Sequence, residues 1–198
     1  MSTTKKPRLV LASQSPRRRD LLTQIGLSFD VVPADIDETP LVEERAEAYV
    51  ARLAKTKAKA GWQPGQLNIG ADTIVVSQGD LLGKPEDQAH CRAILQQLSD
   101  SAHQVFTGVS VFDGTQSYSK VVASTVYMRP ITLAEIDAYW DSGEPQDKAG
   151  AYALQGLGGI FVQRIEGSHS NIIGLPLLET EQLLIDAGFP TWAERKHG

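Results

Sequence analysis

The sequence predicts an α/β protein in which helices pack on a mixed, twisted sheet. Near the N-terminus a short apolar strand, Leu9–Ala12, runs directly into a helical segment, as is typical of α/β proteins. In the middle, strand-like segments follow one another and Asp113-Gly114 marks a hairpin, so part of the sheet should be antiparallel. The chain has 198 residues, 41% of them hydrophobic, which suffices for one sizeable domain. The loop-rich joints at 61–65 and 141–150 are too short to separate two domains, so we expect a single domain over residues 1–198.

The individual elements follow from hydrophobic periodicity and from the residues that bound them. In the first helix, for example, Ser15 is a good N-cap, Pro16 fits the first turn and Gly26 supplies a stop. The predicted strands are Leu9–Ala12, Phe29–Pro33, Asn68–Val76, Val105–Phe112, Lys120–Met128, Gly159–Arg164 and Ser170–Ile173. The predicted helices are Pro16–Ile25, Val42–Ala60, Asp87–Leu98, Leu133–Asp141 and Pro176–Ala187.

Composition argues against several classes of partner. The net charge of −5 and the absence of a basic stripe do not fit a nucleic-acid-binding protein. No apolar run approaches the roughly 18 residues of a membrane span, and the polar N-terminus is unlike a secretory signal. The single cysteine, Cys91, cannot form an internal disulfide and fits a reducing compartment. We therefore expect a cytoplasmic protein without nucleic-acid or membrane partners.

Three consecutive arginines, Arg17–Arg19, lie where the first helix begins. Cations are unfavourable there by roughly 0.3–1 kcal/mol each, because a helix N-terminus carries partial positive charge. A bound anion would reverse that sign, and the hydroxyls of Ser13 and Ser15 add donors beside the guanidinium groups. A solvated basic turn is the alternative. The apolar strand that precedes the turn favours a phosphate site.

Asp72 is the strongest candidate for a functional residue, because it interrupts an apolar strand. A buried carboxylate without a partner costs several kcal/mol, so a cation, a donor or a metal should lie beside it. The alternative is that the strand ends at Gly70 and that Asp72 caps a turn.

Two lysines are candidates for contacts to an anion. Lys57 continues the apolar stripe of Ala46, Val50 and Leu53, so it should point inward, toward a substrate phosphate or Asp72. A lysine that reaches solvent from the helix C-terminus is the alternative. Lys84 lies in a turn before Pro85, from which it can reach a bound anion, although a surface lysine is commoner in such a turn.

Two further segments suggest a metal site and a base-binding site. Asp35, Asp37 and Glu38 form an acidic loop, which together with Asp72 offers the oxygen ligands that magnesium takes. The glycine-rich segment 147–159 contains Gln155, whose amide can hydrogen-bond with the edge of a base, although a surface glutamine in a turn is the alternative.

Taken together, these segments resemble the Maf family of nucleotide pyrophosphatases, in family order from about residue 8 to 187. The matching pieces are residues 11–18, Asp37-Glu38, Arg52-Leu53-Ala54 leading to Lys57-Ala58, residues 70–73, Lys84-Pro85, residues 147–152, Gln155-Gly156 and residues 174–176. The resemblance implies an elongated domain with a central cleft, of the type shared with inosine triphosphate pyrophosphatases, and a homodimer. It also implies hydrolysis of a nucleoside triphosphate to the monophosphate and pyrophosphate with Mg²⁺ or Mn²⁺. A glutamine at the position of Gln155 is similar to the pattern of the family branch that prefers dTTP and UTP. It argues against the branch that prefers methylated guanine nucleotides.

The resemblance also implies roles for individual residues. Asp72 would be the catalytic proton acceptor, and Glu38 and Asp72 would hold the metal. The substrate-binding residues would be Ser13, Arg17, Arg18, Lys57, Lys84, Thr73 and Gln155. Two other functions stay open: a purine-specific pyrophosphatase, and a nucleotide-binding regulator of septum formation that needs no turnover.

Overall fold

The computed structural model describes residues 6–195, which form a seven-stranded mixed sheet and seven α-helices. The strands are β1 (Arg8–Leu11), β2 (Asp30–Val31), β3 (Gln66–Ser77), β4 (Asp80–Leu82), β5 (Ala102–Phe112), β6 (Ser117–Met128) and β7 (Val162–Glu166). The helices are α1 (Pro16–Gln24), α2 (Ala46–Lys59), α3 (Gln88–Leu98), α4 (Leu133–Asp141), α5 (His169–Ile173), α6 (Leu177–Asp186) and α7 (Thr191–Glu194). Three 3-10 segments, η1 (Glu144–Asp147), η2 (Ala149–Ala151) and η3 (Leu157–Phe161), precede β7.

The strand order is β2-β1-β3-β5-β6-β7, with β4 paired to β3. β1 runs parallel to both β2 and β3, whereas the β3–β4 and β6–β7 pairs are antiparallel. The predicted hairpin connects β5 to β6, where the Asp113 carboxylate accepts hydrogen bonds from the backbone N–H groups of Thr115 and Gln116. The mixed α/β sheet predicted from the sequence is therefore confirmed.

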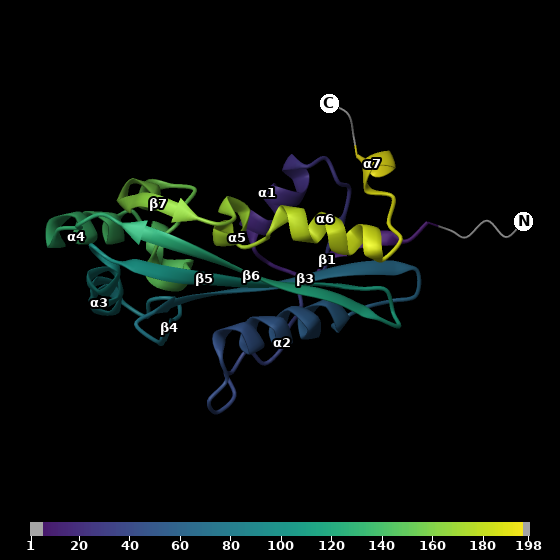
Figure 1. The fold of residues 1–198 in the computed structure, drawn as a ribbon, viewed down its shortest axis with the longest axis horizontal. Coiled ribbons are helices and arrows are strands. Elements are labelled where there is room, and N and C mark those ends of the chain that lie inside the picture. Colours follow the sequence, from purple (N-terminus) through teal and green to yellow (C-terminus); the bar gives the residue numbers. More distant parts are fainter. Residues whose placement is uncertain (1–5, 196–198) are drawn as a thin grey trace, which may run out of the picture. The chain divides into compact units, whose positions relative to one another are not determined.

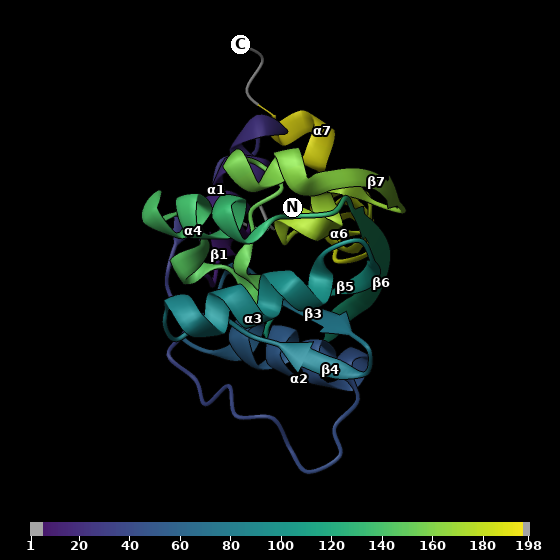
Figure 2. The ribbon, with the colours of Figure 1, turned by 90° about the vertical axis from the view of Figure 1, so that its left-hand side faces the viewer.

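The chain divides into two compact units. The first comprises the residues up to Asp72, Thr107–Val121 and the residues from Gly174, and the second comprises Thr73–Phe106 and Val122–Ile173. Within the first unit, α2 covers one face of the sheet and α1 and α6 cover the other (Figure 1). The same layers are visible after a quarter turn (Figure 2).

Helix α2 lies in direct contact with the backbone of two neighbouring strands. A Cβ atom at Gly70 of β3 would lie 2.3 Å from the Ala54 carbonyl oxygen. A Cβ atom at Gly108 of β5 would lie 2.2 Å from the Val50 carbonyl oxygen. Only glycine allows this approach, which buries the apolar stripe of the helix completely, Leu53 included.

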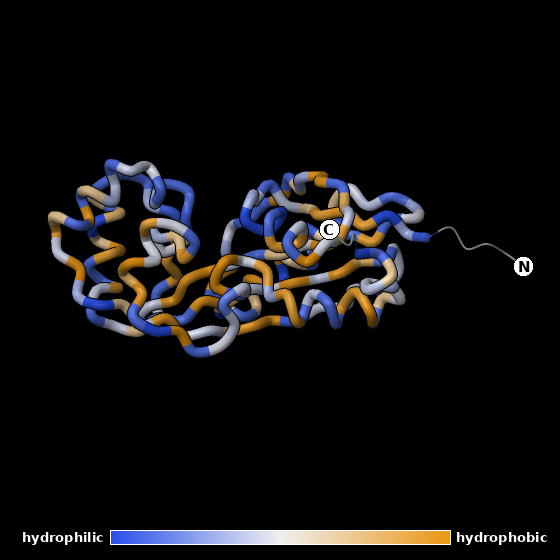
Figure 3. Tube along the Cα trace, turned by 90° about the horizontal axis from the view of Figure 1, so that it is seen from above, coloured by the Kyte–Doolittle hydropathy of each residue, from blue (hydrophilic) through white to orange (hydrophobic). Residues whose placement is uncertain are grey.

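The second unit has a hydrophobic core of its own. Cys91, Leu95 and Leu98 of α3 belong to one cluster with Ile136 and Tyr139 of α4. Along the described residues, hydrophobic and hydrophilic stretches alternate, and many of the outer turns are hydrophilic (Figure 3). Within residues 6–195, no helix combines the length and the apolar character that crossing a membrane requires.

Several predicted elements differ from the structure. Residues 170–173 are helical rather than extended, because the Ser168 hydroxyl accepts a hydrogen bond from the Asn171 N–H and starts a helical turn. The second helix begins at Ala46 instead of Val42, since Glu43 has a φ of +56° that no right-handed helix allows. The strand predicted at 159–164 starts at Val162, after η3, and β2 is shorter than predicted. The short elements β4 and α7 were not predicted.

Candidate active site

A buried lysine of the first unit joins two carboxylates. The Lys57 ammonium donates to Asp72 Oδ1 at 2.7 Å and lies 2.7 Å from Glu38 Oε1. The side chains of Lys57 and Asp72 are 9% and 10% exposed, whereas that of Glu38 is 54% exposed. Of these three side chains, only that of Glu38 is substantially exposed to solvent.

The local sequence explains why these groups meet. Lys57 follows Leu53 by one helical turn on the buried stripe of α2, so its side chain is directed at the sheet. Asp72 lies within β3, which continues unbroken to Ser77, so the alternative of a turn cap at Asp72 is excluded. The expectation that the buried carboxylate has a cation beside it is confirmed, and that cation is Lys57.

The surroundings of Asp72 act on its pKa in opposite directions. Burial raises the pKa above its ordinary value, and the Lys57 and Arg18 charges lower it, with a net upward shift. A carboxyl group with a raised pKa is a better proton acceptor when it is ionised. The environment thus favours a role in proton transfer.

The arginine-rich turn is organised by Ser13 rather than by Ser15. Ser13 is buried, and its hydroxyl accepts hydrogen bonds from the Ser15 N–H and the Arg18 guanidinium, both at 3.2 Å. Ser15 is the N-cap residue of α1, as expected, but its side chain makes no capping hydrogen bond. Arg18 also donates to the Gly174 carbonyl oxygen at 2.8 Å, which fixes its guanidinium group between two segments of the first unit. Arg17 is partly buried and Arg19 is exposed.

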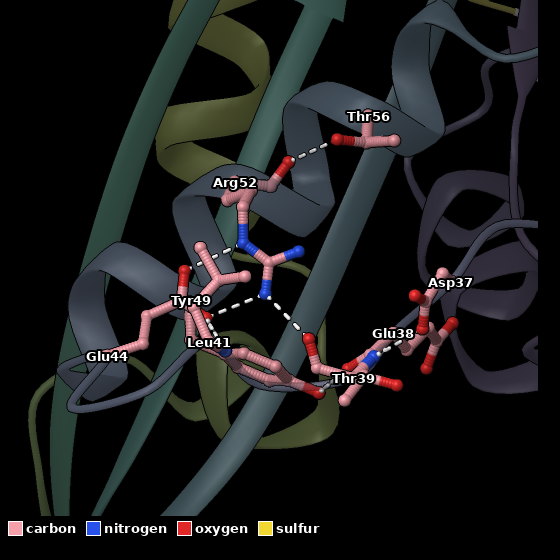
Figure 4. A network of polar contacts seen from close by, with 8 residues as sticks. All are labelled: Asp37, Glu38, Thr39, Leu41, Glu44, Tyr49, Arg52 and Thr56. Carbon is pink, nitrogen blue, oxygen red and sulfur yellow. Dashed lines mark hydrogen bonds and ion pairs between the residues drawn. The ribbon is translucent and has the colours of Figure 1, made fainter.

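The loop that carries Glu38 is tied to α2 by a polar network (Figure 4). The Arg52 guanidinium donates to both Glu44 oxygens, at 2.7 and 2.6 Å, and to the Thr39 carbonyl oxygen at 3.1 Å. The Tyr49 hydroxyl donates to the Glu38 carbonyl oxygen at 2.9 Å. Two residues one turn apart on α2 therefore hold the carbonyl groups of Glu38 and of the next residue, Thr39.

This network was not predicted as part of the site. The Arg52-Leu53-Ala54 segment was noted only as part of the family pattern, and Tyr49 was not noted. The spacing of Tyr49 and Arg52, three residues apart on one helix, was the available signal. Their partners in the preceding loop could not be inferred from spacing.

The donor set of the site fits a divalent metal. Glu38 and Asp72 converge on a single positive charge, and carboxylate oxygens are the ligands that Mg²⁺ prefers. Among residues 6–195, no cluster of three or more His, Cys, Asp or Glu side chains is placed to hold a metal ion. Two carboxylates are the usual protein contribution to a Mg²⁺ site that substrate phosphates and water complete.

The remaining predicted residues belong to the second unit. Thr73 follows Asp72 in β3 and is partly buried, and Lys84 and Gln155 are exposed. The Gly83 carbonyl oxygen accepts a hydrogen bond from the Gly150 N–H at 3.0 Å. The turn that carries Lys84 therefore lies beside the segment that leads to Gln155.

Known proteins resemble this chain over most of its length. The family model "Maf-like protein" matches residues 8–187. A dTTP/UTP pyrophosphatase from Pseudoalteromonas atlantica is 53% identical over 182 residues, which cover 89% of this chain and 95% of that protein. Proteins of the same name from Vibrio vulnificus and Anaeromyxobacter dehalogenans are 51% and 53% identical, over 89% and 93% of this chain and 97% and 96% of theirs.

A HAM1 protein from Coxiella burnetii overlaps in structure with a TM-score of 0.43 and 17% identity, over 62% of this chain and 73% of that chain. The family model covers nearly the whole described chain, and the relatives are matched over nearly their full length. The chain therefore belongs to the Maf family.

Proposed function

We propose that this protein is a nucleoside triphosphate pyrophosphatase that hydrolyses dTTP and UTP to the monophosphate and pyrophosphate. The observation that carries the proposal is the Lys57 ammonium held between the Asp72 and Glu38 carboxylates. Relatives about 50% identical that carry the name dTTP/UTP pyrophosphatase support this substrate class. A regulator without turnover would need a phosphate site but no buried proton acceptor, so the same observation disfavours it.

The reaction is a displacement at the α-phosphorus. The oxygen of a water molecule forms a bond to that phosphorus, the bond to the bridging oxygen breaks, and pyrophosphate leaves with the electron pair. Asp72 accepts the proton that the water loses, and its raised pKa suits that task. Arg18, held in place by Ser13 and Gly174, would bind the triphosphate together with Lys57.

Further residues would complete substrate binding. Ser13, Arg17 and Lys84 would add donors to the phosphates, and the amide of Gln155 would pair with the O4 and N3–H edge of uracil or thymine. Thr73 and Arg17 would shape the selectivity.

Glu38 and Asp72 would hold Mg²⁺ or Mn²⁺. When bound, the metal offsets the negative charge of the triphosphate and of the leaving pyrophosphate. Arg52 and Tyr49 would keep Glu38 in place for this purpose.

We also propose that the protein acts in the cytoplasm as a homodimer. The single cysteine and the family resemblance support these two points. Sedimentation of the purified protein tests the dimer, and a monomer at micromolar concentration would contradict it.

The proposed function is tested by pyrophosphate release from the common ribo- and deoxynucleoside triphosphates with Mg²⁺ or Mn²⁺. We expect turnover of dTTP and UTP that Asp72→Asn abolishes and that the control Asp30→Asn retains, since Asp30 is an exposed carboxylate of β2. Tight binding without turnover would favour the regulator. Turnover confined to purines would reject the role of Gln155.

A further inference from the structure

One carboxylate in the second unit is connected to both arms of the turn that carries Gln155, directly to one arm and through Tyr139 to the other. Glu144 Oε2 accepts from the Leu157 N–H at 2.9 Å, and Oε1 accepts from the Gly158 N–H at 2.9 Å. These are the first two N–H groups of η3, which have no partner within that segment. A negative charge at this end of a helical turn is favourable.

The other arm of the turn reaches the same carboxylate through a phenol. The Ala153 N–H donates to the Tyr139 hydroxyl at 3.1 Å, and that hydroxyl donates to Glu144 Oε1 at 2.7 Å. Residues 154–157 are therefore closed at both ends by one connected chain of hydrogen bonds. Since Ala153 and Tyr139 are buried, the connection is protected from competing water.

Gly156, the neighbour of Gln155, lies directly against the Glu144 carboxylate. A Cβ atom at Gly156 would be 2.3 Å from Oε2 and 2.8 Å from Oε1. The Gly156 backbone is extended, with φ 170°, so glycine is needed here only to leave room for the Glu144 carboxylate in its hydrogen-bonded position.

The Glu144 carboxyl is ionised at neutral pH. Burial alone would raise its pKa, but the hydrogen bonds from Gly158, Tyr139 and Leu157 and the charge of Lys148 hold the pKa below its ordinary value. Tyr139 keeps its proton, because burial and the neighbouring Glu144 raise the pKa of the phenol. The donors and acceptors of the chain are thus fixed.

We propose that Glu144 is the positioning residue that sets pyrimidine selectivity, because it fixes the turn from which the exposed Gln155 side chain projects. The inference rests on the proposed function. Glu144 itself need not touch the nucleotide. An amide that must offer a donor and an acceptor to one base edge discriminates only if its backbone is held in place.

The test compares Glu144→Gln with wild type. The amide of the variant presents an NH₂ group toward a backbone N–H, so one of the three hydrogen bonds is lost and the turn loosens. We expect the ratio of kcat/KM for UTP over CTP to fall by about tenfold. Most of the change in UTP hydrolysis should appear in KM, with kcat altered less than about threefold, because the perturbed contact is remote from the reacting phosphorus.

Asp137→Asn is the matched control. Asp137 is a partly buried carboxylate of α4 that accepts two hydrogen bonds from Arg92 on one oxygen, so the variant neutralises a structural ion pair without touching the turn. It should keep the UTP-over-CTP ratio of the wild type. If Glu144→Gln fails to fold, Tyr139→Phe breaks the same chain with a smaller change and must lower the ratio.

The outcomes separate the two proposals. A wild type that hydrolyses neither UTP nor dTTP rejects the proposed function. A selective wild type together with an equally selective Glu144→Gln rejects the inference alone. Equal loss of selectivity in Asp137→Asn would assign the effect to general destabilisation and would also reject it.

Discussion

The pairing of Lys57 with Asp72 predicts an asymmetry between two single substitutions. Lys57→Met leaves a carboxylate that is 10% exposed without its main counter-charge. Asp72→Asn leaves the lysine with Glu38, a partner that is half exposed. Removing the lysine should therefore destabilise the protein more than removing the aspartate.

The magnitudes follow from the 2.7 Å distance between Lys57 Nζ and Asp72 Oδ1. At an effective dielectric constant of about 20 the gross attraction is about 6 kcal/mol, and the desolvation of two buried ions offsets most of it. We expect Lys57→Met to lower the free energy of unfolding by about 3–5 kcal/mol. The double variant, with a neutral pair, should lose less than the sum of the single variants by about 1–3 kcal/mol.

Urea unfolding of the four proteins of this cycle at pH 7 and pH 5 measures these quantities, with Lys55→Met, an exposed lysine of the same helix, as the control. Without Lys57 the pKa of Asp72 rises further, so the folded state binds a proton that the unfolded state releases. The deficit of Lys57→Met should therefore shrink as the pH falls. Additive losses in the cycle, or a deficit no larger than that of Lys55→Met, would refute the reasoning.

Three further predictions concern other parts of the chain. Burial lowers the pKa of His103 to about 4, so its ring is neutral in the folded state at pH 6.5. Acidification from pH 6.5 to 4 should therefore lower the free energy of unfolding by about 3 kcal/mol. Urea titrations of His103→Gln should no longer show this loss. Arg52→Gln should lower the apparent affinity for Mg²⁺ or Mn²⁺, measured by metal titration of pyrophosphate release, by about 10–100-fold. Arg45→Gln, at an exposed arginine, should leave this affinity unchanged, and equal affinities in the two variants would contradict the prediction. Gly70→Ala should cost about 1–3 kcal/mol, seen as a lower Tm, because its Cβ would meet the α2 backbone, while Gly83→Ala, where a Cβ meets open space, should not.

The sequence was sufficient for the elements with clear periodicity. Apolar runs located β3, β5 and β6, and helical spacing placed Lys57 on the buried face of α2. It failed where side-chain hydrogen bonds decide local structure. The helical turn at Ser168–Asn171 and the 3-10 segment η3 depend on acceptors whose position is set by the tertiary fold.

The contact of Lys57 with Asp72 was one of the two partners expected for this lysine, whereas the contacts around it were not predicted. A lone aspartate in an apolar strand and an inward lysine each needed a partner, and the structure joins them to each other. The Glu38 loop could not be placed, because its position depends on Arg52 and Tyr49 rather than on its own sequence. The assignment of Gln155 to the base stays a prediction.

The contact of α2 with Gly70 and Gly108 has a consequence for how this enzyme can diverge. At these two points no side chain of the strand separates the backbone of the helix from that of the sheet, so the two glycines limit how high the helix lies above the sheet. We therefore expect exchanges among the aliphatic residues around Leu53 to move the Lys57 ammonium less than a side chain at Gly70 or Gly108 would. Directed evolution of the surrounding core should therefore tolerate variation more readily than substitution of either glycine.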